Sequence, residues 1–454
     1  MTEQLRDRIQ ALMPQAKADL AGLVAMRSVA DARQFPPEEC AKAAAWVLEA
    51  FRAEGFADAR LVTTADGSDA VYGTRPSGDP SAPTVLLYAH YDVQPPLDEQ
   101  AWRTPPFTLT EGDDGRWYGR GAADCKGNIV MHLTALRALG DQSPVNLKLI
   151  VEGSEEQGTG GLEEFVPPNA ELFAADAILV CDTGNAAVGR PAATVSLRGL
   201  VNVVVTVEAL RTEVHSGMFG GPAPDALAAL VRLLSTLRDE QGDTTIAGLD
   251  NTQLWDGEPY PDDRFRADAG VLDGADLLGT GSVSDMLWAR PAVSILGIDC
   301  PPVIGSAAAL QPHAAARLNL RIPPGTDPAK ALTALTDHLT ASAPWGVRVS
   351  VAPEASGAPF RAATGGPAYA ALREAMADAF GQPMTMLGQG GSIPLCNVFA
   401  AACPGAEIIL MGVEEPQTLM HAPNESVHPQ EIADMALAEA LFLQRFASAA
   451  TTKE

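Results

Sequence analysis

Short apolar runs alternate with amphipathic helical segments through the first half of the chain. The runs at residues 84–88, 145–151 and 177–180 have the length and composition of buried strands. Between them, residues 128–139 carry apolar positions at helical spacing, as residues 38–51 do nearer the start. Strands that alternate with helices in this order predict an α/β sheet that is largely parallel.

The pattern changes after residue 193 and returns after residue 365. The intervening part mixes alternating strands with helices in the order of a compact α+β domain, at residues 194–208, 224–237, 317–322, 327–339 and 346–351. Helix, strand and helix then follow at residues 367–380, 408–411 and 429–446. At 454 residues the chain is too long for one ordinary core. The sequence therefore predicts one domain from residues 1–193 and 359–454, and a second, residues 194–358, inserted into it.

Charge and cysteine usage narrow the classes of function. The chain has 31 Lys and Arg against 57 Asp and Glu, a net charge of -26, which disfavours nucleic acid as a partner. We expect no membrane association, since no apolar run approaches the roughly 20 residues that span a bilayer. The N-terminus shows no signal peptide, and the six cysteines form no CxxC pair. Reduced thiols in a cytoplasmic protein are therefore expected, with a secreted disulfide framework as the lesser alternative.

Polar side chains follow the predicted strands at their carboxyl ends, where open α/β sheets bind ligands. One more carboxylate lies on a glycine-flanked turn before the helix at 128–139, and a histidine lies in a late loop. Each alone has an ordinary explanation, as a turn residue or a hydrogen-bonded structural histidine. Together they form a ligand set for two divalent ions, zinc first, with manganese or cobalt as alternatives. The set comprises His90, Asp124, Glu156, Asp182 and His421.

Two further acidic positions fit roles beside such a centre. Asp92 could accept the second ring N–H of a metal-bound His90, or could be a simple turn residue. Glu155 and Glu156 could be a solvated pair. In the functional interpretation one of them ligates metal while the other stays free to take a proton from water. From the residues alone, either Glu155 or Glu156 could be the metal ligand and the other the proton acceptor.

Several motifs resemble a family of dinuclear metallopeptidases that includes aminoacylase, glutamate carboxypeptidase, succinyl-diaminopimelate desuccinylase and carnosinase. Within it, the similarity is to the branch of cytosolic nonspecific dipeptidase and carnosinase. The resemblance extends from His90 to His421, with the motifs in the family's order. The motifs are Leu87-Tyr88-Ala89-His90-Tyr91-Asp92-Val93, Gly119-Arg120-Gly121-Ala122-Ala123-Asp124-Cys125-Lys126-Gly127 and Glu152-Gly153-Ser154-Glu155-Glu156.

The resemblance implies a role for each ligand. Asp124 would bridge two metal ions, with His90 and Asp182 on one ion and Glu156 and His421 on the other. An Asp at position 182 is typical of family members that require a free substrate amine. The family also has a cis peptide bond after the bridging Asp, which is expected here between Asp124 and Cys125.

The resemblance also assigns the proton transfers and the two domains. Glu155 would be the general base and acid, acting on a hydroxide that bridges the two metals, and Asp92 would assist beside His90. The mostly parallel sheet and its flanking helices, from residues 1–193 and 359–454, would form the catalytic domain. The inserted α+β domain would be a lid and dimerisation domain.

The inserted domain and a later loop are expected to contact the substrate. His215 resembles the histidine that reaches the partner subunit's active site, so the chain is expected to be a homodimer. An N–H donor there would stabilise the oxyanion of the tetrahedral intermediate. Arg321 resembles the arginine that grips the substrate carboxylate. Gly391 and Ser392 resemble a glycine-serine loop that touches the substrate backbone.

These features predict a metal-dependent dipeptidase for dipeptides with a free amino terminus and a free carboxylate. The first alternative is an N-acyl-amino-acid deacylase or carboxypeptidase on the same scaffold, which would prefer substrates with blocked amines. The second alternative, from another class, is a non-catalytic binding protein that kept the fold. Loss of ligands would favour it, and all five are present.

Overall fold

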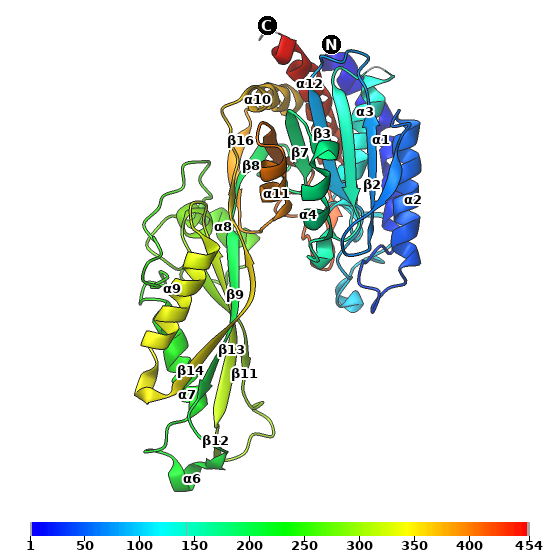
Figure 1. Ribbon diagram of the computed structural model, residues 1–454. Helices are drawn as coiled ribbons and strands as arrows, with labels where there is room; N and C mark the ends of the chain where they lie inside the picture. The colour runs from blue at the N-terminus through cyan, green and yellow to red at the C-terminus, as the bar shows by residue number, and fades with distance from the viewer. Residues whose placement is uncertain (1, 142, 452–454) are drawn as a thin grey trace. The chain divides into compact units, whose positions relative to one another are not determined.

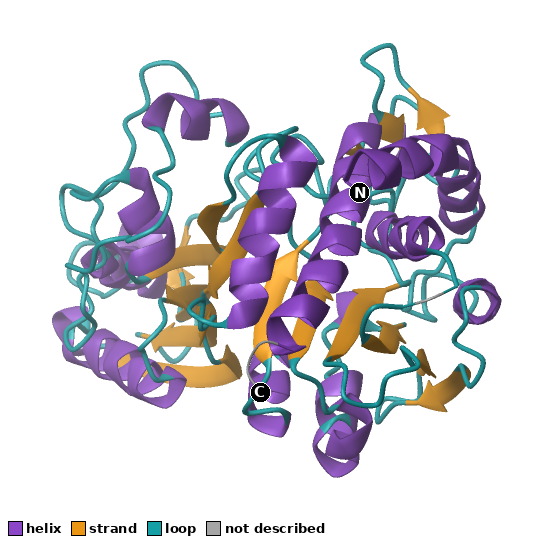
Figure 2. Ribbon diagram, turned by 90° about the horizontal axis from the view of Figure 1, so that it is seen from above, coloured by secondary structure: helices purple, strands orange, loops and turns teal. Residues whose placement is uncertain are grey.

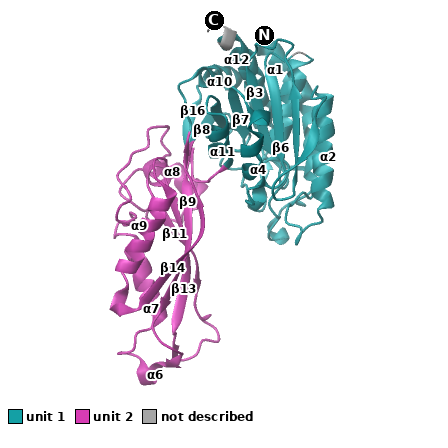
Figure 3. Cartoon of the chain, in the orientation of Figure 1, with its two compact units in different colours: residues 1–195, 362–387, 395–454 teal, residues 196–361, 388–394 magenta. Residues whose placement is uncertain are grey.

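The chain folds into two compact units. The computed structural model describes residues 2–141 and 143–451. Unit 1 comprises Met1–Val195, Ala362–Leu387 and Leu395–Glu454, and unit 2 comprises Ser196–Arg361 and Gly388–Pro394 (Figure 3). The catalytic role expected of the first domain, and the lid and dimerisation role expected of the inserted one, stay predictions.

A mixed sheet, most of whose strands belong to unit 1, forms the base of the fold. Its order within the described residues is β1-β2-β6-β3-β7-β17-β8-β15, and β16 also pairs with β8. The central strands β6, β3, β7 and β17 are parallel, while β1, β2, β8 and β15 pair antiparallel. The predicted α/β sheet is confirmed, with its parallel part confined to the centre. The bounds are β1 Arg60–Thr63, β2 Asp69–Arg75, β3 Thr84–His90, β6 Asn146–Glu152, β7 Ala177–Cys181, β8 Ala192–Leu197, β15 Phe360–Arg361, β16 Thr385–Gln389 and β17 Glu407–Met411.

Helices cover both faces of this sheet (Figures 1 and 2). Four long helices pack on one another as one layer: α1 (Thr2–Val24), α3 (Lys126–Leu139), α10 (Pro367–Phe380) and α12 (Pro429–Thr451). The short helix α11 (Leu395–Ala402) packs against α4 (Gly161–Phe165), α5 (Ala170–Phe173) and β17, and α2 (Glu38–Ala53) packs against β2. Helix α3 ends at Gly140, whose φ of 78° suits a residue without a Cβ. No described helix is both long and apolar enough to cross a bilayer.

A small three-stranded sheet joins segments that are far apart in the sequence. Strand β5 (Trp117–Tyr118) pairs with β4 (Thr110–Glu111) on one side and with β18 (Ser426–Val427) on the other. The segment just before Asp124 therefore lies beside the segment just after His421.

Unit 2 is a four-stranded antiparallel sheet with helices on one face. The order is β11-β13-β9-β14, formed by Ala292–Asp299, His313–Ile322, Gly199–Glu208 and Arg348–Gly357. Alternate residues of β9 pack in a core with α7 (Ala226–Leu234) and α9 (Pro328–Ala341), and these residues are Val201, Val203, Val205 and Val207. The alternating segment 194–208 thus forms two strands, β8 and β9, with Arg198 between them. Two short helices also belong to this unit, α6 (Ser216–Phe219) and α8 (Asp262–Asp268).

Candidate metal centre

The first group of predicted ligands meets at the carboxyl ends of two neighbouring parallel strands. His90 is the last residue of β3, and Asp182 follows the last residue of β7. The Nε2 atom of His90 lies 3.1 Å from Asp124 Oδ1 and 3.2 Å from Asp182 Oδ1. All three side chains are at least nine-tenths buried.

The second group shares Asp124 with the first. His421 Nε2 lies 3.0 Å from Asp124 Oδ2 and 3.1 Å from Glu156 Oε2. Glu156 belongs to the one-turn 3-10 helix Glu155–Gln157 that follows β6, and Gln94 Nε2 donates to the same carboxylate oxygen at 2.8 Å. Asp124 therefore offers one oxygen to each group, and the peptide bond between it and Cys125 is cis, as expected.

The donor set fits divalent metal ions. Two ligand atoms bound about 2.1 Å from a tetrahedral zinc ion lie roughly 3.4 Å apart, close to the separations seen here. Among the described residues, two groups bring ligand atoms close together, His90 with Asp124 and Glu156, and His90 with Cys125 and Asp182. The Cys125 thiol donates to the Cys181 carbonyl at 3.0 Å, and burial raises its pKa to about 12. A protonated thiol is a poor ligand, so we favour the carboxylate sets.

Electrostatics at the site favour bound cations. Burial raises the pKa of Asp124, but hydrogen bonds from His421 and His90 outweigh it and hold that pKa well below its usual range. The hydrogen bonds that His421 donates to Asp124 and Glu156 raise the pKa of His421 to about 11. Burial opposes protonation of His90, yet Cys125, Asp124 and Asp182 raise its pKa well above normal. Without metal the imidazoles supply the positive charge, and a divalent ion would displace their protons.

Asp92 lies between His90 and the turn that carries Glu155 and Glu156. Its two carboxylate oxygens accept the backbone N–H groups of Glu155 at 3.2 Å and of Glu156 at 3.0 Å. The closest partner of His90 Nδ1 is the Asp92 backbone carbonyl at 3.0 Å, while the carboxylate oxygen is 3.4 Å away. The Asp92 carboxylate therefore lies beside the His90 ring, and its role as a partner of His90 stays a prediction. The carboxylate fixes the turn that carries both glutamates.

Glu155 is the acidic side chain at the site that is left without a partner. Within the described part of the chain, no hydrogen bond or ion pair reaches its carboxylate. Burial, with the negative charge of Asp182 next, raises its pKa well above the ordinary value. A carboxylate that is held in place, free and basic is suited to proton transfer.

A residue that sequence reasoning missed links the two metal-ligand loops. Glu425, four residues after His421, is fully buried. One of its carboxylate oxygens accepts from Arg120 Nη1 at 2.7 Å and from the N–H of Gly121 at 3.0 Å. The other accepts the N–H groups of Ala123 and Asp124, each at 3.2 Å. No local pattern announces this role, because its partners lie about 300 positions away.

The remaining predicted residues lie in unit 2, where the described contacts are local. Arg321 is on β13, and its Nε donates to Asn319 Oδ1 at 3.1 Å. His215 is exposed on the short strand β10 (Val214–His215), which pairs with β12 (Ala309–Leu310). Its Nδ1 accepts the N–H of Gly217 at 3.1 Å.

The predicted glycine-serine loop belongs to the same unit. A Cβ added at Gly391 would meet nothing within 4 Å, whereas one at Gly390 would lie 2.9 Å from Arg198 Nη2. Ser392 Oγ would lie 3.6 Å from a Cβ added at Gly357. The predicted contact of this loop with the substrate backbone stays a prediction.

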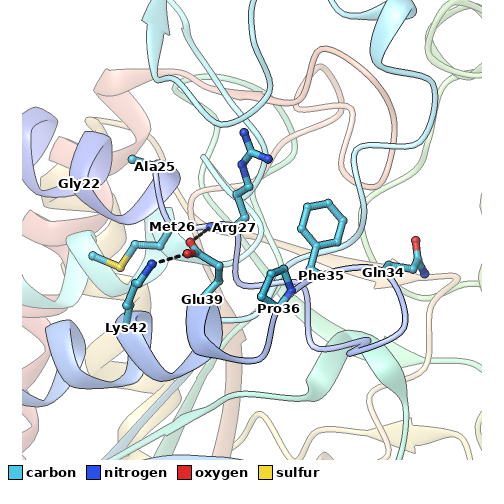
Figure 4. Close-up of a pocket in the computed structure, with 9 residues that line it drawn as sticks. All are labelled: Gly22, Ala25, Met26, Arg27, Gln34, Phe35, Pro36, Glu39 and Lys42. Atoms are coloured by element: carbon cyan, nitrogen blue, oxygen red, sulfur yellow. Dashed lines mark hydrogen bonds and ion pairs between the residues drawn. The ribbon is translucent and has the colours of Figure 1, made fainter.

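A separate concavity in unit 1 contains none of the predicted site residues. It has a volume of about 660 Å³ and lies beside the start of α2 (Figure 4). Glu39 in it accepts from Lys42 at 2.5 Å and from the Arg27 backbone N–H at 3.1 Å, so its charge is satisfied. The lining residues are Gly22, Ala25, Met26, Arg27, Gln34, Phe35, Pro36, Glu39 and Lys42.

Comparison with known proteins identifies the family. Residues 86–445 match the profile of Peptidase family M20/M25/M40. The chain belongs to this peptidase family. The predicted resemblance to dinuclear metallopeptidases is thereby confirmed at the level of the family.

Relatives in the M20 family carry dipeptidase names. The chain is 44% identical over 409 residues to a cysteinylglycine-S-conjugate dipeptidase of Corynebacterium striatum, covering 88% of this chain and 89% of the relative. It is 33% identical over 348 residues to a Beta-Ala-His dipeptidase of Rattus norvegicus, covering 71% and 68%. Human carnosine dipeptidase 1 superposes with a TM-score of 0.81 at 25% identity, covering 98% of this chain and 99% of that one.

Membership of the M20 family confirms two predictions, the class of enzyme and the fold. The chain is a metallopeptidase by family, and the α/β fold is confirmed. The dipeptidase Dug1p of Saccharomyces cerevisiae, with a TM-score of 0.82 at 23% identity over 99% of both chains, shares the fold. Divalent metal ions are implied by the family. The number and identity of the ions, the role of each residue and the oligomeric state stay predictions.

Proposed function

We propose that the protein is a metal-dependent dipeptidase that cleaves dipeptides with a free amino terminus and a free carboxylate. The observation that carries the proposal is the division of the Asp124 carboxylate, with one oxygen 3.1 Å from His90 Nε2 and the other 3.0 Å from His421 Nε2. Such a carboxylate is suited to bridge two ions. Relatives named for Cys-Gly and Beta-Ala-His substrates support the substrate class.

The chain's own residues have separable tasks in this proposal. His90 and Asp182 would hold one ion, Glu156 and His421 the other, and Asp124 would bridge them. When bound, two zinc ions would supply Lewis acidity that lowers the pKa of water and polarises a carbonyl.

Proton transfer falls to Glu155. Its unpartnered carboxylate would take a proton from the attacking water and pass it to the leaving amine. The Asp92 carboxylate fixes the backbone of the turn that carries Glu155 and Glu156.

A substrate panel tests the proposal. Chelated protein restored with zinc, manganese or cobalt in turn is assayed against Cys-Gly, β-Ala-His and other dipeptides, and against N-acetyl and N-succinyl amino acids. We expect turnover of free dipeptides, and Glu155→Gln should lower kcat by about 10²- to 10⁴-fold while metal content is kept. Turnover of blocked amino acids with dipeptides ignored would favour the deacylase alternative, and no turnover at all would favour a binding protein.

The proposal includes a homodimer in which His215 acts on the partner's active site. The contact from Gly217 requires an unprotonated Nδ1, so the neutral ring carries its proton on Nε2, which faces away from that contact. An exposed N–H donor of this kind would stabilise an oxyanion. A cytoplasmic location, with the six cysteines free as the structure has them, is part of the same proposal.

Mixing two inactive variants tests the exchange of His215. Glu155→Gln and His215→Ala subunits would each lack one function, and a mixed dimer would regain one complete site. Recovery of activity after the variants are co-refolded supports donation from the partner. If the mixture stays as inactive as its components while mixed dimers form, His215 does not act across subunits.

A further inference from the structure

Arg198 is a buried cation without a counter-charge. It lies between β8 and β9 and is only 8% exposed. Its Nε and Nη1 atoms are buried and have no hydrogen-bond partner within the described residues, and no ion pair involves it. Burial, helped by the positive charge of Arg321, lowers the pKa of Arg198 to about 10, so the side chain is charged at neutral pH. A buried charge left unpaired is strongly unfavourable, and proteins keep such a charge where a ligand pairs with it.

A second guanidinium lies close to Arg198. Arg321 pairs with Leu200 across β13 and β9, and Arg198 stands two residues before Leu200, just ahead of the first residue of β9. The positive charge of Arg321 lowers the pKa of Arg198, as expected for two neighbouring guanidiniums. Arg321 Nη1 is likewise buried and unpartnered. Two adjacent like charges repel, which makes an anion between them the natural partner of both.

The two faces of the β11-β13-β9-β14 sheet differ, and the arginine pair does not lie on the face that packs in the core. Val201 and its alternates face the helices α7 and α9, whereas Asn202 and Asn319 lie on the face of Arg321. Asn319 Nδ2 donates to Asn202 Oδ1 at 2.6 Å, and Asn319 Oδ1 accepts from Arg321 Nε at 3.1 Å. This network fixes Arg321 while its Nη1 donor stays free for a ligand.

The loop that carries Ser392 leaves room beside Arg198. A Cβ at Gly390 would lie 2.9 Å from Arg198 Nη2, so the backbone passes close to the guanidinium here. The backbone N–H of Arg198 donates to the Gln389 carbonyl at 3.3 Å, which anchors the loop to the arginine. The arginine pair and the loop thus belong to one local structure.

We propose that Arg198 and Arg321 together form the site for the substrate carboxylate, with Arg198 as a second binding residue beside the arginine expected for that role. The inference rests on the proposed function, since it takes the anion to be the free carboxylate of a dipeptide. Two guanidiniums give the carboxylate more N–H donors than one arginine offers. The site therefore selects for a free carboxyl terminus.

The test replaces Arg198 by a side chain of similar length without charge. Zinc-restored Arg198→Met, Arg198→Lys and wild-type protein are assayed with Cys-Gly and with Cys-Gly amide. The control is Arg317→Met on the same strand and face as Arg321, because Arg317 is exposed and pairs with Glu354 at 2.8 Å. Calorimetric binding of Cys-Gly is measured in the Glu155→Gln background, and the Tm of each ligand-free protein is recorded.

We expect Arg198→Met to raise the KM for Cys-Gly by about 10- to 100-fold, to leave kcat within about threefold, and to change the amide little. Arg198→Lys should recover part of the loss, and the Arg317 control should match wild type. The ligand-free Tm of Arg198→Met should equal or exceed that of wild type, because an uncompensated buried charge has been removed.

The outcomes separate the two proposals. If wild type hydrolyses Cys-Gly and Arg198→Met has the same KM for it as Arg317→Met, the inference is overturned, while the dipeptidase proposal is supported. A lower Tm with unweakened Cys-Gly binding makes Arg198 structural and also overturns it. If wild type hydrolyses no dipeptide, the proposed function fails, and calorimetry then decides alone: no binding, or binding that Arg198→Met does not weaken, overturns the inference.

Discussion

Replacing Glu425 by glutamine should destabilise the protein far more than removal of a surface ion pair would. The Glu425 carboxylate accepts four N–H donors, two on each oxygen, and is fully buried. An amide keeps one oxygen and replaces the other by an NH₂ group, which cannot accept. Whichever oxygen is kept, two buried donors lose their acceptor.

The magnitude follows from two routes that agree. Each buried donor left unsatisfied costs about 1–3 kcal/mol, which gives about 2–6 kcal/mol for two. Breaking a buried ion pair by removing one partner costs about 3–5 kcal/mol, which applies if Arg120 loses its contact. A loss of about 4 kcal/mol in the free energy of unfolding is therefore expected for Glu425→Gln.

The assay is urea unfolding at pH 7 in the presence of a chelator, so that metal binding does not contribute to stability. Glu354→Gln is the matched control, because Glu354 pairs with the exposed Arg317 and should lose less than about 1 kcal/mol. In a parallel experiment Glu425→Gln should bind zinc more weakly, since the loop of Asp124 is no longer fixed. Equal stability losses in the two variants, with zinc affinity unchanged, would refute this account of the loop.

Three further predictions address the centre and its surroundings. Burial raises the pKa of Glu152 from 4.5 to about 8. As pH rises from 4.5 through 8, the wild type should therefore lose up to about 5 kcal/mol of unfolding free energy relative to Glu152→Gln. If urea unfolding gives the same difference in free energy between the two proteins at pH 5 and at pH 9, this prediction is contradicted. Gly184→Ala should destabilise the protein by several kcal/mol in thermal unfolding, because a Cβ there would lie 1.9 Å from the Glu414 backbone oxygen, whereas Gly365→Ala meets nothing within 4 Å and should be neutral. Zinc at about 100 times its Kd should raise the stability of chelated protein by about 2.7 kcal/mol, and Asp124→Asn should abolish most of that gain.

The sequence predicted three of the ligands because they follow recognisable strands. His90 and Asp182 stand at or just past the ends of apolar runs, and parallel neighbours bring those ends together. Asp124 and His421 were proposed from a turn and a late loop, and the family resemblance assigned the ligands to two groups. Hydrophobic periodicity also predicted α10 with the bounds the structure has, Pro367–Phe380.

Other features depend on contacts that no local pattern contains. The mixed flanks of the sheet arise because β2 returns antiparallel beside β6, a pairing that the run of residues 69–75 does not specify. Glu425 and Arg198 were missed for a related reason. An acidic residue in a loop and an arginine between strands look like surface positions until burial and partners are known. The Asp92 carboxylate lies 3.4 Å from His90 Nδ1, and it also accepts the backbone N–H groups of Glu155 and Glu156, which the sequence did not indicate.

The central claim is that Asp124 divides its carboxylate between two metal ions. Crystals of zinc-restored protein measured on both sides of the zinc absorption edge test it directly. The account predicts two anomalous peaks per subunit, one between His90 and Asp182 and one between Glu156 and His421, each in contact with a different Asp124 oxygen. A single peak, or peaks that leave Asp124 unbound, would contradict it.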